Sequence, residues 1–186
     1  KDISFEVHSG EIVGDAGVSG NGQSELLDII AGIYPLQNGV IRINDREITS
    51  ESIMDAASMR RLGMAHVPED RQRKGLVTSF TASENIILGY HRDPAYNSLI
   101  EMDIDAISKS CREQMKHFDV RPVNPSLRAS LFSGGNQQKM VVAREIERNT
   151  DLLLVGQPTR GVDIGAIEFI HRQIISMRDA KKAVLL

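Results

Sequence analysis

A serine followed by two glycines, at the expected start of a helix, is the segment of this sequence best suited to bind an anion. Ser133 is able to cap a helix, and Gly134 and Gly135 let a phosphate approach the main chain closely. Backbone N–H groups at a helix N-terminus attract negative charge. The apolar residues from Met140 to Ile146 predict the helix itself. We therefore expect residues 133–137 to bind a phosphate group.

A glycine-rich loop lies upstream of this segment. Residues 17–24 fit the P-loop pattern Gly-x-x-x-x-Gly-Lys-Ser at every position except the lysine. Gln23 stands where the lysine would reach the β and γ phosphates, while Ser24 keeps the hydroxyl that binds Mg²⁺ in such loops. By analogy with a lost oxyanion donor, the missing charge costs about 10²–10³ in rate. The alternative is a tight glycine turn in an α/β fold. The residues predicted to bind nucleotide in this loop are Gly17, Ser19, Gly20, Asn21, Gly22, Gln23 and Ser24.

A third segment with altered chemistry follows an apolar strand predicted at Leu152–Val155. A P-loop ATPase ends this strand with an aspartate that holds Mg²⁺, often followed by a glutamate that polarises the attacking water. Gly156 and Gln157 stand at these places, and neither side chain ionises. We therefore predict no catalytic residue in this chain's own site, and poor hydrolysis there.

The elements that must position these segments alternate between strands and helices. This texture predicts an α/β fold of the P-loop type, with a small antiparallel layer at residues 40–45 and an inserted helical lobe. We expect residues 1–80 and 131–186 to form the α/β core and residues 81–130 to form the lobe. The predicted strands of the main sheet are residues 3–7, 11–13, 63–68, 152–155 and 183–186.

Apolar spacing and caps predict the helices. Thr81 and Glu84 are spaced as a capping box, and Asp163 is able to cap the last helix. The predicted core-facing residues are Leu26, Leu27, Ile30 and Ile33 in the first helix, Ile104, Ile107, Cys111, Met115 and Phe118 in the lobe, and Ile164, Ile167, Ile170 and Ile174 in the last helix.

Composition limits the classes of function. The 186 residues are 41% hydrophobic, enough for one substantial core, and the formal charge of −3 gives no reason to propose nucleic acid as a partner. The single cysteine, Cys111, forms no internal disulfide, which favours a reducing compartment. No apolar run has the length of a membrane span, so we expect a soluble chain, and one that is a piece of a longer protein.

Together these segments resemble the ATP-binding subunits of ABC transporters, specifically the second ATP-binding half of the duplicated simple-sugar and nucleoside importers. Residues 17–24 resemble the lysine-less P-loop of that half, and residues 133–139 resemble its signature motif. Residues 66–71 resemble its Q-loop, with Glu69 in place of the usual glutamine. Residues 157–163 are similar to its altered Walker B and D-loop run, which is typical of the nucleoside branch. We call residues 17–24 the P-loop and residues 133–137 the signature segment.

The resemblance implies a head-to-tail pair of ABC domains, with each nucleotide between the P-loop of one and the signature of the other. Ser133, Gly134, Gly135, Asn136 and Gln137 would then contact ATP on the partner domain. Glu69 would join this chain's own nucleotide site, where Ser24 is the candidate Mg²⁺ ligand. Asp163 would act in the D-loop contact between domains.

The same resemblance implies ATP and Mg²⁺ as cofactors and a peripheral place on the cytoplasmic face of a bacterial membrane. The implied partners are another ABC domain, expected in the N-terminal half of the same chain, membrane permease subunits and, indirectly, a substrate-binding protein. The cargo, a nucleoside or a simple sugar, stays open. The alternative function is a non-transport ABC-type module, a nucleotide-gated scaffold or regulator.

Three features have equally plain structural explanations. The charged run at residues 69–74 is either a solvated loop or a contact with the permease. His66 lies in an apolar strand, where a packed histidine is expected, and Cys111 lies on an apolar helical face, where packing is again expected.

Overall fold

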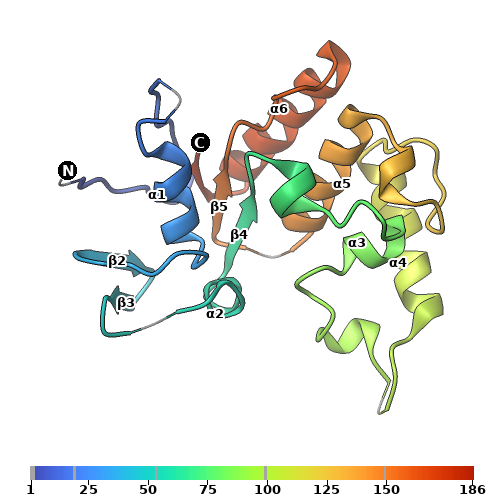
Figure 1. The fold of residues 1–186 in the computed structure, drawn as a ribbon, viewed down its shortest axis with the longest axis horizontal. Helices are drawn as coiled ribbons and strands as arrows, with labels where there is room; N and C mark the ends of the chain where they lie inside the picture. Colours follow the sequence, from blue (N-terminus) through green and yellow to red (C-terminus); the bar gives the residue numbers. More distant parts are fainter. Residues whose placement is uncertain (1–2, 19, 53, 99, 149) are drawn as a thin grey trace.

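A computed structural model describes residues 3–18, 20–52, 54–98, 100–148 and 150–186 of the chain. Its centre is a parallel sheet of four strands, in which the last strand of the sequence lies between the first strand and the others (Figure 1). In spatial order the strands are β1 (Ile12–Val13), β6 (Ala183–Leu185), β5 (Leu152–Val155) and β4 (Met64–Val67). All four carboxyl ends therefore lie along one edge, the usual place for a ligand site in such sheets.

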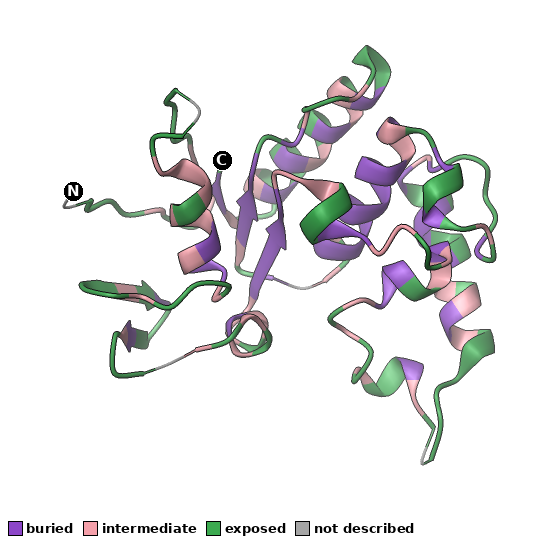
Figure 2. Cartoon of the chain, viewed as in Figure 1, coloured by how far each residue is buried: buried purple, intermediate pink, exposed green. Residues whose placement is uncertain are grey.

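Helices cover both faces of this sheet. On one side lies α1 (Gln23–Ile30), and on the other lie α5 (Gly134–Ile146) and α6 (Ile164–Asp179) (Figure 1). Side chains alternate along the strands, so Leu153 packs with the α5 and α6 side while Leu154 packs with the α1 side. Burial is concentrated where the sheet meets α5 and α6 (Figure 2).

A separate antiparallel hairpin lies beside α1, formed by β2 (Val40–Ile43) and β3 (Arg46–Thr49). Its inner residues Ile43 and Ile48 pack against Met59 of α2 (Ala56–Arg61). The predicted hairpin is confirmed, whereas α2 was not anticipated, because its six residues are too few to show a helical period.

Helices account for the regular structure between residues 81 and 130. These are α3 (Ala82–Ile86), the short turn η2 (Pro94–Tyr96), α4 (Ile104–His117) and the turn η3 (Ala129–Leu131). The predicted capping box of Thr81 and Glu84 is present. Cys111 is fully buried on α4, and burial raises the pKa of its thiol to about 11. None of the helices in the described part of the chain has the length and apolar character that a bilayer span requires.

Some local predictions are wrong. Residues 3–7 form no strand in the structure, because none of the described strands pairs with them. Ile33 follows the end of α1, past Gly32 at φ +73°, and is 42% exposed. Ile104 and Ile164 are the first residues of α4 and α6, and both are exposed, since the first turn of each helix extends beyond the core.

Candidate functional site

The P-loop follows β1 and runs into α1. Gly20 and Gly22 have φ of +89° and +104°, values that favour glycine. Gly22 is the N-cap of α1 and supplies no side-chain hydrogen bond, so the first N–H groups of the helix are left for another acceptor. Gly20 and Asn21 are exposed. Ser19, predicted to bind nucleotide, lies outside the described residues.

Gln23, the residue in the lysine position, folds back onto its own loop. A Cβ atom added at Gly17 would lie 1.6 Å from Gln23 Nε2, so any larger residue at position 17 would displace the glutamine amide. The amide therefore lies inside the P-loop, as a neutral donor where other P-loops place a cation.

Ser24, the next residue, is bonded to a different segment. Its hydroxyl donates to Glu69 Oε2, and Glu69 Oε1 accepts from Arg160 Nη1 at 2.5 Å. Glu69 follows β4, and Arg160 lies in the turn after β5. Three segments far apart in sequence are thus joined by one carboxylate at the carboxyl edge of the sheet.

Gly156 directly follows β5, at the place of the missing aspartate. Its N–H donates to the carbonyl of Val67 at 2.8 Å, and a Cβ atom there would lie 2.9 Å from the backbone nitrogen of Glu69. Gln157 has a φ of +40°. The loop after β4 therefore fills the space that a side chain at position 156 would need.

A cavity of about 370 Å³ opens between α1, the ends of β5 and β6, and α6. It gathers polar residues of the P-loop and of the two loops after β4 and β5, above an apolar wall from α1 and β6. The polar and glycine residues at its mouth that were predicted from sequence are Gln23, Ser24, Glu69, Gly156 and Gln157.

The donor set for Mg²⁺ at this cavity is small. The Ser24 hydroxyl and the Glu69 carboxylate contact each other, and Glu69 also contacts Arg160. Asp15, Gln157 and Thr159 are the other oxygen-bearing side chains at the cavity besides Gln23. Mg²⁺ requires near-octahedral oxygen ligands. No group of three or more His, Cys, Asp or Glu side chains fit to hold a metal occurs in the described ranges. The Arg160 guanidinium already occupies one Glu69 oxygen, so the residues as arranged do not fit a Mg²⁺ ion bound to that carboxylate.

The signature segment begins α5, as predicted. Ser133 is the N-cap, and its Oγ accepts from the Asn136 N–H at 3.3 Å. A Cβ atom at Gly134 would lie 2.7 Å from Arg71 Nη2, and one at Gly135 would lie 2.5 Å from Asp163 Oδ2. From the sequence, both glycines were predicted to admit a phosphate; in the structure both also lie close to side chains of the same chain, so a larger residue at either position would make a neighbour shift.

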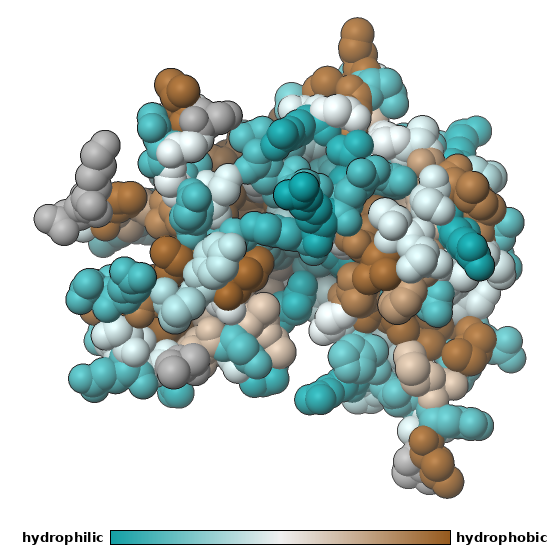
Figure 3. All heavy atoms as spheres, viewed as in Figure 1, coloured by the Kyte–Doolittle hydropathy of each residue, from teal (hydrophilic) through white to brown (hydrophobic). Residues whose placement is uncertain are grey.

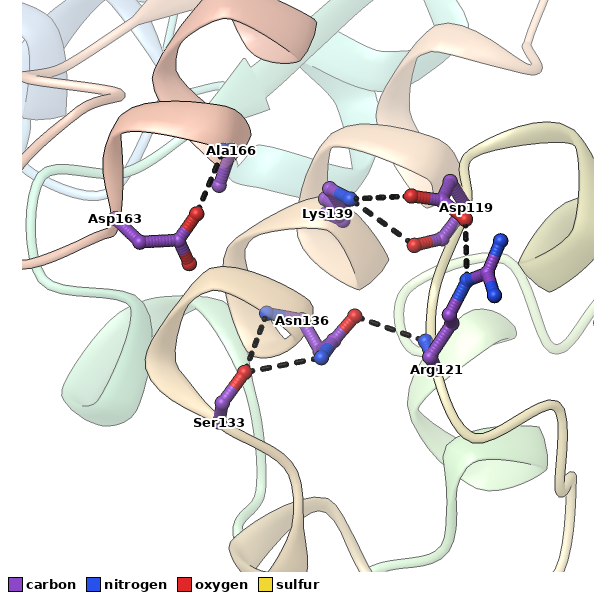
Figure 4. A network of polar contacts seen from close by, with 7 residues as sticks. All are labelled: Asp119, Arg121, Ser133, Asn136, Lys139, Asp163 and Ala166. Carbon is purple, nitrogen blue, oxygen red and sulfur yellow. Dashed lines mark hydrogen bonds and ion pairs between the residues drawn. The ribbon is translucent and has the colours of Figure 1, made fainter.

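Side chains of the signature segment, and Lys139 just after it, form hydrogen bonds with neighbouring loops (Figure 4). Asn136 donates to Ser133 Oγ at 2.9 Å and accepts from the Arg121 N–H at 2.8 Å. Lys139 donates to the carbonyl and the carboxylate of Asp119, both at 3.0 Å. Gln137 is buried and donates to two backbone carbonyls of its own chain, at 2.9 and 3.2 Å. Its side chain is therefore turned inward, and its predicted contact with a nucleotide on a partner domain stays a prediction.

Asp163 is the N-cap of α6, as predicted, and Oδ1 accepts from the Ala166 N–H at 2.9 Å (Figure 4). Its other oxygen is the atom that lies against Gly135. The starts of α5 and α6 are therefore in contact. A role of Asp163 toward another domain stays a prediction.

The loop after β4 connects the P-loop helix with the signature helix, and hydrophilic side chains gather over it (Figure 3). It forms the π-helical turn η1 (Arg71–Gly75). Lys74 pairs with the buried Asp28 of α1 at 2.5 Å, and this hydrogen bond raises the pKa of Lys74. Arg71 donates to the carbonyls of Arg160 and Gly161 at 2.8 and 3.2 Å. In this charged run, residues 72–74 are exposed to solvent, while Arg71 and Lys74 also bond to neighbouring segments of the chain.

Arg71 and Arg160 were not among the site residues predicted from the sequence. Both lie inside motifs that the prediction singled out. Arg71 is two residues after Glu69, and Arg160 directly precedes Gly161, so a cation near each motif was visible in the sequence. Their contacts cross 89 to 91 residues, so sequence spacing does not predict them.

Beneath this loop lies a buried charged cluster on α5. Glu145 is 0% exposed, accepts from Tyr90 Oη at 2.7 Å, and pairs with Arg144 at 2.7 Å and Arg60 at 3.9 Å. Burial by itself would raise the pKa of Glu145, but the two guanidinium groups and the tyrosine lower it overall. The nearby His66 is buried in β4, which confirms a packed histidine, and burial lowers its pKa to about 4.

Comparison with known proteins decides the family. A family model described as ABC transporter matches residues 1–160. The chain belongs to the ABC transporter family. Proteins of this family bind and hydrolyse ATP, so the P-loop and signature segment are now placed in a family that uses both.

Two curated relatives of this ABC chain are importers. The nucleoside import ATP-binding protein NupA of Lactococcus lactis subsp. cremoris is 46% identical over 186 residues, which cover 100% of this chain and 36% of the relative. The guanosine import ATP-binding protein NupO of Bacillus subtilis is 44% identical, with the same two coverages. The chain thus spans about a third of the length of these relatives.

Solved ABC structures share the fold. A dimeric ATP-binding cassette in a post-hydrolysis state, bound to ADP and phosphate, has a TM-score of 0.75 at 24% identity, covering 100% of this chain and 78% of that chain. A nucleotide-free ATP-binding cassette from an ABC transporter also has a TM-score of 0.75, at 20% identity, covering 98% and 72%. The predicted fold class is confirmed.

Proposed function

We propose that this chain is the nucleotide-binding part of an import ATPase for a nucleoside or a simple sugar. The observation that carries the proposal is the identity of 46% and 44% to a nucleoside and a guanosine import ATP-binding protein across the whole chain. A xylose import protein of Burkholderia ambifaria, 40% identical, keeps simple sugars open as cargo.

Within this ATPase, we assign the chain to the second nucleotide-binding half. Its own P-loop lacks the lysine, and the turn after β5 lacks both carboxylates, so it hydrolyses ATP poorly. Its signature segment completes the site on the partner domain, where water hydrolyses ATP with Mg²⁺ as the cofactor. The exposed Ser133 and the backbone N–H groups of Gly134 support this role. Residues 1–80 and 131–186 form the core that carries both segments, and residues 81–130 form the helical lobe.

The partners follow from the import function. Import ABC ATPases work with membrane permeases and substrate-binding proteins, and we place this chain on the cytoplasmic face of a bacterial membrane, bound to the permease and to another ABC domain. Its net charge of −3 provides no electrostatic support for nucleic acid as a partner.

The test is a charge introduced at the signature segment of the intact ATPase. Ser133→Asp keeps a good N-cap and places a carboxylate at a helix N-terminus, so α5 stays folded. The same carboxylate repels the γ-phosphate on the partner domain. We expect the ATPase rate of the intact protein with its permease to fall about 10²-fold or more. Ser126→Asp, an exposed serine outside α5, adds the same charge and leaves the rate unchanged.

A wild-type rate in the Ser133→Asp protein would show that the signature segment is structural and would overturn this assignment. Affinity purification tests the transport class separately. Recovery with a membrane permease supports import, whereas recovery only with ribosomes or DNA favours a nucleotide-gated scaffold.

A further inference from the structure

The candidate metal ligands at this chain's own P-loop, Ser24 and Glu69, have an arginine paired with the carboxylate. Ser24 and Glu69 are the candidate oxygen donors that contact each other there, and both Glu69 oxygens are engaged, one by Ser24 and one by Arg160. A Mg²⁺ ion bound to this carboxylate would have to displace the Arg160 guanidinium or lie against it as a like charge.

A carboxylate at position 156 is not simply absent. The Gly156 N–H donates to the carbonyl of Val67, and the backbone nitrogen of Glu69 lies 2.9 Å from the place of a Cβ atom at position 156. An aspartate there would therefore require the loop after β4 to move. Backbone contacts at Gly156 and side-chain contacts at Glu69 therefore both disfavour a metal ion at this site.

Arg160 is suited to take over the electrostatic part of the metal's role. Among the described residues, its side chain is engaged only through Nη1, and it is 62% exposed, so Nη2 and Nε remain as donors. A guanidinium binds phosphate oxygens through two parallel hydrogen bonds and stays charged. Arg71 supports the turn that carries it, by donating to the Arg160 carbonyl at 2.8 Å.

We propose that this P-loop binds the phosphates of a nucleoside triphosphate without a divalent metal, with Arg160 as the counter-cation held in place by Glu69. This inference rests on the proposed function as a nucleotide-binding half. It concerns binding only: the site retains the nucleotide, and no bond is broken there. Mg²⁺ is then required at the partner domain's P-loop and not at this one.

The test must distinguish nucleotide binding at this P-loop from binding at any second nucleotide site, so its readout is local to the P-loop. Hydrogen exchange measured by mass spectrometry on the intact protein reports protection of peptides within residues 14–30, as a nonhydrolysable ATP analogue is titrated with Mg²⁺ or with EDTA. We expect the half-maximal concentration for these peptides to agree within about threefold in the two conditions. Protection that appears only with Mg²⁺, or no protection at all, would overturn the proposal.

Arg160→Gln sharpens the result. It removes the counter-cation and frees Glu69, so we expect affinity in EDTA to fall about tenfold or more, the size of one charge-assisted hydrogen bond. Arg172→Gln, an exposed arginine of α6 paired with Glu168, is the matched control and leaves the affinity unchanged. Equal affinities in EDTA for Arg160→Gln and wild type would overturn the role of Arg160.

The outcomes separate this inference from the proposed function. Metal-dependent protection of residues 14–30 together with a loss of ATPase in Ser133→Asp would keep the import ATPase and remove the metal-free site. An unchanged ATPase rate in Ser133→Asp would remove the trans assignment, whatever the metal dependence.

Discussion

The P-loop and the signature segment are both glycine-rich turns that open a helix, yet they are supported in different ways. The signature segment has a serine cap, and its two glycines are packed against Arg71 and Asp163. The P-loop has an uncapped start, and a Cβ atom at Gly20 or Gly22 would meet nothing within 4 Å. The signature turn is packed against other segments of its own chain, whereas the P-loop has open space beside Gly20 and Gly22.

The two regions also differ in how far their residues are buried. α5 is buried along most of its length and carries the Glu145 cluster, whereas Gly14–Val18 are exposed. The proposed role of the signature segment toward a partner domain is helped by a buried helix, because a misplaced donor would lose alignment with the phosphate. Changes on the α5 side should therefore cost more stability than matched changes in exposed parts of the chain or near the P-loop.

The largest effect is expected at Glu145. Glu145→Gln leaves Arg144 and Arg60 without their buried counter-charge, so the free energy of unfolding should fall by about 3–5 kcal/mol. Chemical denaturation measures it. The control is Glu25→Gln on the exposed face of α1, expected within about 0.5 kcal/mol of wild type. Equal effects of the two changes would contradict the contrast in burial.

His66 lies between the two regions, since Asp28 of α1 and Glu145 of α5 both influence its pKa. Its folded pKa of about 4 is below the unfolded value of 6.5. The unfolded chain therefore binds the proton first as pH falls. Stability is complete above about pH 6.5 and decreases between pH 6.5 and 4, by roughly 3 kcal/mol in total from this group.

The measurement is the free energy of unfolding against pH for wild type and His66→Gln. The variant should lose the part of the slope that lies between pH 6.5 and 4. His8→Gln, at an exposed histidine, should keep the wild-type slope. An unchanged slope in His66→Gln would show that the imidazole is not the titrating group.

A third effect is expected at Gly135. Gly135→Ala places a Cβ atom 2.5 Å from Asp163 Oδ2 and 3.2 Å from Ala166 Cβ, so α5 and α6 must separate slightly. The expected cost is about 1–3 kcal/mol. Gly14→Ala, in the open segment after β1, meets nothing within 4 Å and should change stability by less than about 0.5 kcal/mol. Thermal unfolding of both variants compares them, and a neutral Gly135→Ala would refute the packing argument.

The smallest effect concerns the helix caps. Ser133→Ala removes the side-chain acceptor for the Asn136 N–H and for the Asn136 amide, at a cost of about 1 kcal/mol. Gln23→Ala, at the start of the uncapped α1, should cost about 0.5 kcal/mol or less. Urea denaturation measures the free energy of unfolding of both variants. A larger decrease for Gln23→Ala than for Ser133→Ala would show that the P-loop end of α1 is the better supported helix start.

Local sequence patterns predicted most of the elements and the three chemical segments. The caps at Thr81, Ser133 and Asp163 are read from residue type and spacing, and all three are present. The strand predicted at residues 3–7 was wrong, because alternation of apolar residues does not supply a pairing partner. The helix-start residues Ile104 and Ile164 were misplaced, because period alone does not say which turn meets the core.

By itself, the sequence determined the chemistry that each segment is able to perform: a P-loop with no lysine, a strand end with no carboxylate, and a capped Ser-Gly-Gly turn. Residue type and close spacing are enough for that. Only the tertiary structure decided which groups meet. The strand order β1-β6-β5-β4 brings Ser24, Glu69 and Arg160 together across separations of 45 and 91 residues. Contacts at such separations depend on how the strands pack, and no local pattern encodes that order.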